Sequence, residues 1–144
     1  MPRALLDTSD PFAAACRRDE AHDDALPILR GIDDGSLPDA VVLDYVLAET
    51  LNGLVTHAGH DAAVDFLDRL EENTRFNVDS LTADAFATGK APFRRHDTFS
   101  LVDACIVAYI QTEGLGYLYA FDDDFDRVDD VVRLDTPTDP YDPN

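Results

Sequence analysis

The stretch SLVDACIVAYI, residues 100–110, limits the possible folds of this chain more than any other. Its only charge is Asp103, and apolar residues fall on every helical face, which is typical of a fully buried helix. Ser100 precedes Asp103 by three residues, the spacing between an N-cap residue and the third helical position. A buried carboxylate without a partner is costly or takes up a proton. Asp103 therefore either caps backbone amides or faces a site that holds a cation.

The segments around this helix alternate between two kinds of pattern. Short apolar runs predict strands at residues 3–7, 40–43, 75–78, 117–121 and 131–134. Amphipathic patterns predict helices at residues 12–18, 22–32, 46–58, 61–70 and 81–88. This alternation favours an α/β fold with a parallel sheet covered by helices. We expect one domain over residues 1–134 and an acidic, Pro-rich tail over residues 135–144 that frays.

The charge of the chain is strongly negative, with 30 acids against 11 bases and a net charge of −19. The acids are spread along the chain, which is typical of a protein kept soluble in a salty cytoplasm, so we expect a halophilic source. Because 25 of the acids are aspartates, a single aspartate is weak evidence for a site. Basic residues are scarce and therefore informative, and several gather in GKAPFRRHD, residues 89–97, which we predict to be a loop.

The sequence also bears on location and on cysteine chemistry. No apolar run approaches the length of a membrane span, and the N-terminus lacks the apolar core of a signal peptide, so we expect a cytoplasmic protein without a membrane association. Cys16 and Cys105 lie in predicted helices, and we expect free core thiols. Ligand spacings typical of zinc sites do not occur.

Four acids occupy related positions in the predicted fold. Asp7 and Asp122 each end a strand, Asp103 begins the buried helix, and Glu49 lies one turn into the helix after the second strand. Ligands of open α/β sheets bind outside the carboxyl ends of the strands. Each acid alone could be a cap, a solvated surface charge or a turn residue. Together they favour a site for Mg²⁺ or Mn²⁺, which prefer oxygen ligands.

At these positions the chain resembles the PIN-domain family. The resemblance is carried, in the family's order, by LLDTSDPFAAA, VVLDYVLAETLNGL, FSLVDACIVAYI and LYAFDDDFDRV, which span residues 3 to about 134. It implies a three-layer α/β/α sandwich on a mainly parallel sheet and metal-dependent cleavage of RNA.

The resemblance also implies roles for individual residues. The implied ligands of Mg²⁺ or Mn²⁺ are Asp7, Glu49, Asp103 and Asp122, with Asp124 as a further candidate. Asp122 is preferred over Asp123 because it directly ends the strand. Thr8 or Ser9 would hydrogen-bond a metal ligand or a phosphate. Phosphate binding needs cations, so the candidates for RNA contact are Lys90, Arg94 and Arg95.

Small single-domain proteins that resemble this chain are commonly VapC-like toxins of type II toxin–antitoxin pairs. The resemblance therefore implies a ribonuclease that forms a homodimer and binds an antitoxin through the early helices, residues 12–30 and 46–70. The position of Lys90 argues against a signalling receiver domain, and Ser9 argues against a phosphatase of the haloacid dehalogenase type. A non-catalytic PIN-fold module that binds RNA or protein stays open as the alternative.

Overall fold

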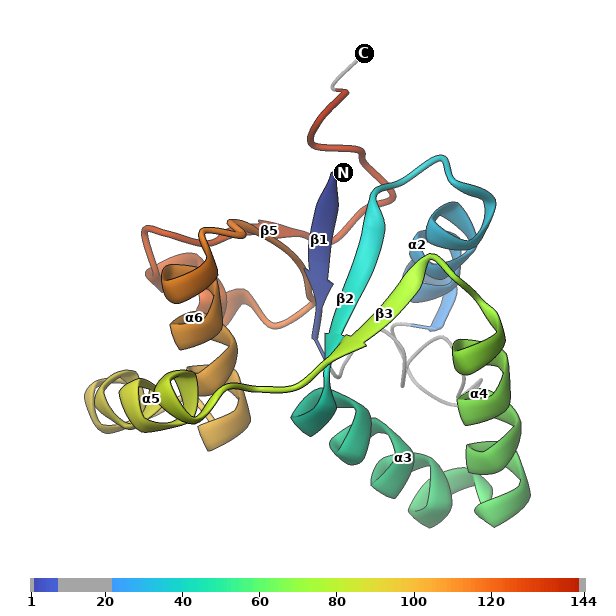
Figure 1. The fold of residues 1–144 in the computed structure, drawn as a ribbon, viewed down its shortest axis with the longest axis horizontal. Helices are drawn as coiled ribbons and strands as arrows, with labels where there is room; N and C mark the ends of the chain where they lie inside the picture. Colours follow the sequence, from blue (N-terminus) through green and yellow to red (C-terminus); the bar gives the residue numbers. More distant parts are fainter. Residues whose placement is uncertain (1, 8–21, 143–144) are drawn as a thin grey trace.

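The computed structural model describes residues 2–7 and 22–142, and a five-stranded sheet runs through its centre (Figure 1). The strands follow the order β3-β2-β1-β4-β5, and every neighbouring pair is parallel. Their bounds are Arg3–Leu6 for β1, Asp39–Leu43 for β2, Phe76–Asp79 for β3, Tyr117–Tyr119 for β4 and Val132–Leu134 for β5. The predicted parallel sheet is confirmed, with the first strand of the chain at its centre.

Helices cover both faces of this sheet. They are α2 (His22–Asp34), α3 (Asp44–Ala58), α4 (His60–Glu72), α5 (Ala83–Arg95) and α6 (Leu101–Glu113), with a short 3₁₀ helix, η1, at Asp123–Arg127. Figure 1 shows α5 and α6 on one side of the sheet and α2 and α4 on the other, so the three-layer sandwich is confirmed. The helix predicted at residues 12–18 lies outside the described residues.

The core forms where α6 packs on the central strands. Every residue of α6 from Ala104 to Ile110 is buried, which confirms the prediction of a helix that is apolar all round. Leu5 of β1, Val41 of β2 and Leu118 of β4 are fully buried beneath the helices. Strands that are covered on both faces need such continuous apolar runs.

The prediction of a loop at residues 89–97 is wrong for most of its length, because α5 continues to Arg95. Gly89 is buried where α5 meets α6, and a Cβ atom there would lie 3.0 Å from Sγ and 3.2 Å from Cα of Cys105. Pro92 lies inside the helix, and the turn after it still closes, since the N–H of His96 donates to the carbonyl of Pro92 at 2.9 Å. Gly and Pro usually end helices, but here close packing on α6 outweighs their low propensity.

The tail does not fray over residues 135–142. The hydroxyl of Tyr119 donates to the carbonyl of Thr138 at 2.8 Å, and the hydroxyl of Tyr141 donates to the carbonyl of Arg3 at 2.9 Å. The ring of Tyr141 also lies 5.1 Å from that of Tyr117. Tyrosines thus tie the acidic tail to β1 and β4.

The structure also bears on the cysteines and on the question of a membrane span. Cys105 is a free, buried thiol as predicted, and Cys16 lies outside the described residues. None of the helices in the described part of the chain combines the length and apolar character that a bilayer span requires.

Candidate metal centre

Asp7 lies at the carboxyl end of the central strand. Its backbone N–H donates to the carbonyl of Tyr119 at 3.1 Å and so extends the ladder between β1 and β4. Asp7 is only 4% exposed, which is unusual for an acid. The sheet continues to β2 on one side of β1 and to β4 on the other, so Asp7 lies at the point where the order of the strands reverses. Ligands of α/β sheets bind at this kind of position.

Asp103 begins α6 as one half of a capping box. The N–H of Asp103 donates to Oγ of Ser100, and the N–H of Ser100 donates to Oδ2 of Asp103, both at 3.1 Å. The three-residue spacing of Ser100 and Asp103 in the sequence predicts this capping box. The reciprocal bonds satisfy two amides at the helix start and hold the carboxylate in one orientation.

The carboxyl of Asp103 also responds to other acids. Burial raises its pKa above the ordinary value, and the charges of Asp122 and Glu49 raise the pKa further, while the bonds with Ser100 act to lower it. Both acids are therefore within electrostatic reach of Asp103. Three of the predicted site residues therefore interact electrostatically, but among them only Asp122 belongs to the group of carboxylates in the described residues whose oxygens lie within 4.8 Å of one another.

Glu49 and Asp122 reach this edge from different directions. Glu49 lies on the exposed face of α3, which it shares with Tyr45 as the sequence predicts. Asp122 follows β4 and caps η1, because its Oδ1 accepts the N–H of Asp124 at 2.9 Å. Asp122 and Asp124 are half-buried, whereas Asp123 is exposed.

The donor chemistry of this edge fits a hard divalent cation. Carboxylate oxygens from Asp122, Asp123 and Asp124 all lie within 4.8 Å of one another. Asp103 adds a carboxylate whose ionised form is disfavoured by burial and then by its acidic neighbours, a cost that a bound cation would relieve. Oxygen-only ligand sets of this kind suit Mg²⁺ or Mn²⁺ and not zinc.

The remaining predicted site residues are the two hydroxyl residues and the three candidates for RNA contact. Thr8 and Ser9 lie outside the described residues. Lys90, Arg94 and Arg95 lie on α5 and not on a loop. Arg95 faces a hollow of about 400 Å³ between α5, α6 and the segment after η1, which Arg127 also lines.

Sequence reasoning missed a contact between two helices beside the acids. The rings of Tyr45 on α3 and Phe86 on α5 lie 5.8 Å apart and meet edge to face. Nothing local in the sequence pairs these residues. Their only signal was the exposed side of α3, where Tyr45 lies one turn before Glu49.

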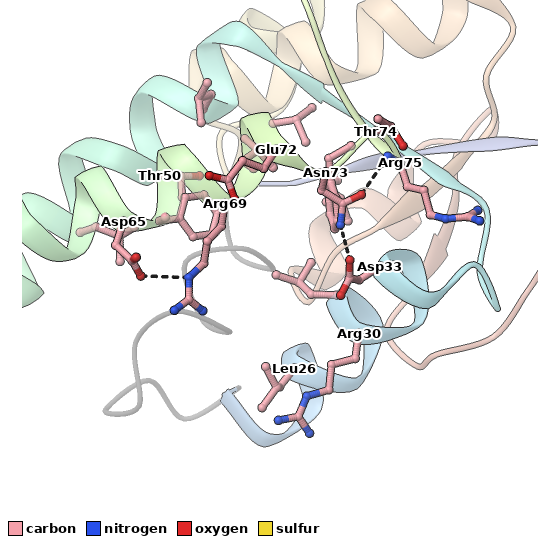
Figure 2. A pocket seen from close by; sticks show the side chains of 18 of the residues that line it. Leu26, Arg30, Asp33, Thr50, Asp65, Arg69, Glu72, Asn73, Thr74 and Arg75 are labelled. Carbon is pink, nitrogen blue, oxygen red and sulfur yellow. Dashed lines mark hydrogen bonds and ion pairs between the residues drawn. The ribbon is translucent and has the colours of Figure 1, made fainter.

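A separate cleft of about 880 Å³ opens among α2, α3 and α4 (Figure 2). Its apolar lining includes Leu26 and Leu29 of α2, Leu54 of α3 and Phe66 of α4. Arg69 also lines the cleft, and its guanidinium pairs with Asp65 at 3.1 Å on the exposed side of α4. A cleft of this volume with apolar side chains in its lining is within the usual range of binding pockets.

A family model described as PIN domain matches residues 4–131. The chain belongs to the PIN domain family. The match includes Asp7, Glu49, Asp103 and Asp122, so all four acids lie inside the PIN domain. No sequence among the curated proteins matches this PIN domain.

Solved structures share the fold of this PIN domain. Mycobacterium tuberculosis VapC20, described as a Sarcin-Ricin loop cleaving toxin, is 29% identical, with a TM-score of 0.75 over 88% of this chain and 95% of that one. A toxin–antitoxin complex from Klebsiella pneumoniae is 20% identical, with a TM-score of 0.60 over 94% and 98%. VapBC2 from Rickettsia felis, bound to a DNA fragment from its promoter, is 15% identical, with a TM-score of 0.66 over 92% and 97%.

Proposed function

We propose that this PIN domain is a metal-dependent endoribonuclease and the toxin of a type II toxin–antitoxin pair. The observation that carries the proposal is the set of acids at the carboxyl edge of the sheet, where the charges of Asp122 and Glu49 act on the half-buried carboxyl of Asp103. The likeness to VapC20, a toxin that cleaves the Sarcin-Ricin loop, supports RNA as the substrate.

In this proposal Asp7, Glu49, Asp103 and Asp122 hold Mg²⁺ or Mn²⁺, and Asp124 lies close enough to Asp122 to assist. The bound ion would supply positive charge that activates water and offsets the charge developing on the phosphate. The chain's own contribution is to fix the oxygens. Oδ2 of Asp103 accepts the N–H of Ser100, and this bond fixes the orientation of a carboxylate that would hold the ion.

The antitoxin in this proposal occupies the apolar cleft of Figure 2. Most of the described residues that line it come from α2, α3 and α4, which overlap the early helices that the sequence analysis selects for this role, and the rest come from strands and from the segment between α4 and β3. Deep apolar side chains such as Phe66 and Leu54 would anchor the partner, and Arg30 and Arg69 would favour acidic residues on it. A homodimer belongs to the same proposal.

The test is cleavage of RNA by the purified protein in buffer with a high concentration of KCl. Wild-type protein is incubated with transfer, ribosomal and single-stranded RNA, with Mn²⁺ or Mg²⁺ or with EDTA. We expect cleavage only with the metal, and we expect Asp103→Asn to lower the rate by about 100-fold or more, the scale of losing a group that stabilises transition-state charge. Asp68→Asn, which removes the same charge from the exposed side of α4, should cleave as wild type does.

Two results would contradict the proposal. Cleavage that persists in EDTA would exclude the metal mechanism, and equal rates in wild type and Asp103→Asn would exclude the assigned site. Metal binding without cleavage of any RNA would favour a non-catalytic PIN-fold module that binds RNA or protein.

A further inference from the structure

Aromatic and basic side chains gather on the exposed surface next to the acids. We call this surface the aromatic–basic strip, and it comprises Tyr45 on α3 together with Phe86, Lys90, Phe93 and Arg94 on α5. Lys90 follows Phe86 by four positions, and Phe93 and Arg94 follow Lys90 by three and four positions, so the four residues share one side of the helix. The strip joins two helices that follow different strands.

Contacts along the strip hold it together as one surface. The ring of Tyr45 meets that of Phe86 edge to face at 5.8 Å, and Nζ of Lys90 lies 5.5 Å from the centre of the Phe86 ring. Tyr45 is nevertheless 40% exposed, and Phe93 is 45% exposed. Large parts of two rings are therefore open to a partner.

The strip lies beside the acids. Tyr45 is one helical turn before Glu49 on the exposed side of α3, and the charge of Glu49 acts on the carboxyl of Asp103. A polymer bound along the strip would therefore pass close to the carboxyl edge of the sheet.

The bases of the strip are not engaged by acids. Ion pairs in the described ranges involve Arg69, Arg75 and Arg133, whereas Lys90 and Arg94 take part in none of them. Most bases of the described residues also take part in no ion pair, so what distinguishes Lys90 and Arg94 is their place beside exposed rings. Cations next to exposed rings complement a polyanion that also presents flat apolar faces.

We propose that the aromatic–basic strip binds single-stranded RNA, with bases stacked on Tyr45 and Phe93 and phosphates beside Lys90 and Arg94. This proposal rests on the ribonuclease function proposed above. Stacking on aromatic rings tolerates any base and does not depend on counterion release, whereas phosphate contacts weaken as salt rises. For a protein with a net charge of −19, stacking supplies affinity that electrostatics cannot. Paired bases in a duplex cannot stack in this way.

The test measures binding of a fluorescent single-stranded RNA of about twelve nucleotides, a length within the usual range for single-strand binding surfaces. Fluorescence anisotropy is recorded in EDTA, the integrity of the RNA is checked on a gel, and the same sequence as a duplex is the comparison. The variants are Tyr45→Ala, Tyr45→Phe and Lys90→Gln. Tyr141→Ala is the matched control, because Tyr141 is 46% exposed but lies on the tail.

We expect wild type to prefer the single strand to the duplex and Tyr45→Ala to bind it about tenfold more weakly. Tyr45→Phe, which keeps the ring, and Tyr141→Ala should bind as wild type does. The loss in Tyr45→Ala should be similar at about 0.2 M and about 2 M KCl, while Lys90→Gln should reduce the slope of log affinity against log salt by about 0.7.

Three results would overturn the proposal. These are unchanged affinity in Tyr45→Ala, no binding by wild type, and conversion of a dimer to a monomer by Tyr45→Ala in light scattering. The last result would assign the strip to self-association.

Cleavage assays separate this proposal from the ribonuclease function. Wild type that binds through the strip but cuts no RNA leaves the strip standing and contradicts the function. Wild type that cuts single-stranded RNA with a KM that Tyr45→Ala does not change leaves the function standing and contradicts the strip. A higher KM with an unchanged kcat in Tyr45→Ala supports both.

Discussion

The Oδ2 atom of Asp103 accepts the N–H of Ser100 in the capping box, while the same carboxyl lies within electrostatic reach of Asp122 and Glu49. Burial and the neighbouring acids disfavour the ionised form of the carboxyl, whereas the cap favours it. The first two effects are larger, so the pKa of Asp103 is raised. The alternatives that the sequence left open for Asp103, cap or site, are therefore both compatible with one side chain.

The raised pKa makes Asp103 a cost to the stability of the metal-free protein. An aspartate in the unfolded chain has a pKa near 3.8, and the folded value is higher. The cost is therefore absent below the unfolded pKa, grows as pH rises between the two values, and is complete above the folded pKa. At neutral pH the folded protein carries the whole cost, which a bound cation would offset.

We predict that Asp103→Asn is at least as stable as wild type at pH 7 in EDTA, because asparagine cannot ionise. Mn²⁺ should raise the melting temperature of wild type by several degrees, since a ligand at about 100 times its Kd adds about 2.7 kcal/mol, and it should not raise that of Asp103→Asn. Thermal unfolding followed by circular dichroism measures both effects. Asp68→Asn should respond to Mn²⁺ as wild type does, and an equal response in Asp103→Asn would remove Asp103 from the ligand set.

The pair formed by α5 and α6 shows how one small residue can set the position of an element. Gly89 lets α5 approach the backbone of α6 at Cys105, and this contact carries α5 past Pro92 to Arg95. On the same helix, one turn before Gly89, Phe86 meets the ring of Tyr45 on α3. A side chain at position 89 would act on stability and on the surface beside the site at once.

We predict that Gly89→Ala lowers the free energy of unfolding by about 1 kcal/mol, because overpacking of about 1–3 kcal/mol exceeds the gain of up to about 1 kcal/mol in helix propensity. Urea unfolding measures the change. Ala87→Gly, at an exposed position of the same helix, gives the propensity effect alone. A higher free energy of unfolding for Gly89→Ala would contradict this prediction and would mean that α5 and α6 can move apart at little energetic cost.

Sequence reasoning succeeds where the deciding signal is local. Asp7 directly follows β1 as predicted, and Ser100 and Asp103 have the spacing of a capping box, so a strand end and a helix start could be placed from neighbouring residues alone. The strand predicted at residues 117–121 is shorter, because β4 ends at Tyr119 and Asp122 instead caps η1. Sequence reasoning fails at α5, because Gly89 and Pro92 are ordinary helix breakers unless the packing of a distant helix outweighs them.

The same limit applies to contacts between distant segments. The prolines and aspartates of the tail predict disorder, but Tyr141 donates to the carbonyl of Arg3, Tyr119 of β4 donates to the carbonyl of Thr138, and Asp135 pairs with Arg133. The contact between Tyr45 and Phe86 depends on the pairing of β2 with β3, because α3 follows β2 and α5 follows β3. Neither the tyrosine bonds nor the ring contact has a signature in the sequence near the residues involved.

The charge of the whole molecule governs its response to salt. A net charge of −19 on 144 residues creates repulsion that favours the unfolded chain unless ions screen it. Arg133, whose side chain is 15% exposed, pairs with Asp126 through two hydrogen bonds and also pairs with Asp135, whereas the pair of Arg69 with Asp65 is exposed and contributes little. These few pairs leave most of the negative charge unbalanced, so we expect screening by salt to stabilise the fold.

We predict that the melting temperature falls when KCl is lowered from about 2 M to about 0.1 M, where the Debye length is about 10 Å. Differential scanning calorimetry measures the change, and sucrose at equal osmolality in place of KCl should not restore stability, because it carries no charge. A melting temperature that does not depend on KCl would exclude the halophilic interpretation of the composition.

The central strand β1 is made first during synthesis, but its neighbour β4 and the acid Asp122 come from near the end of the chain. A nascent chain released before Asp122 contains Asp7, Glu49 and Asp103 without their last companion. Domains generally fold as units, and the central sheet cannot close until β4 has left the ribosome. Under the proposed function, a prematurely terminated product would lack one of the four proposed ligands, so we expect it not to cleave RNA.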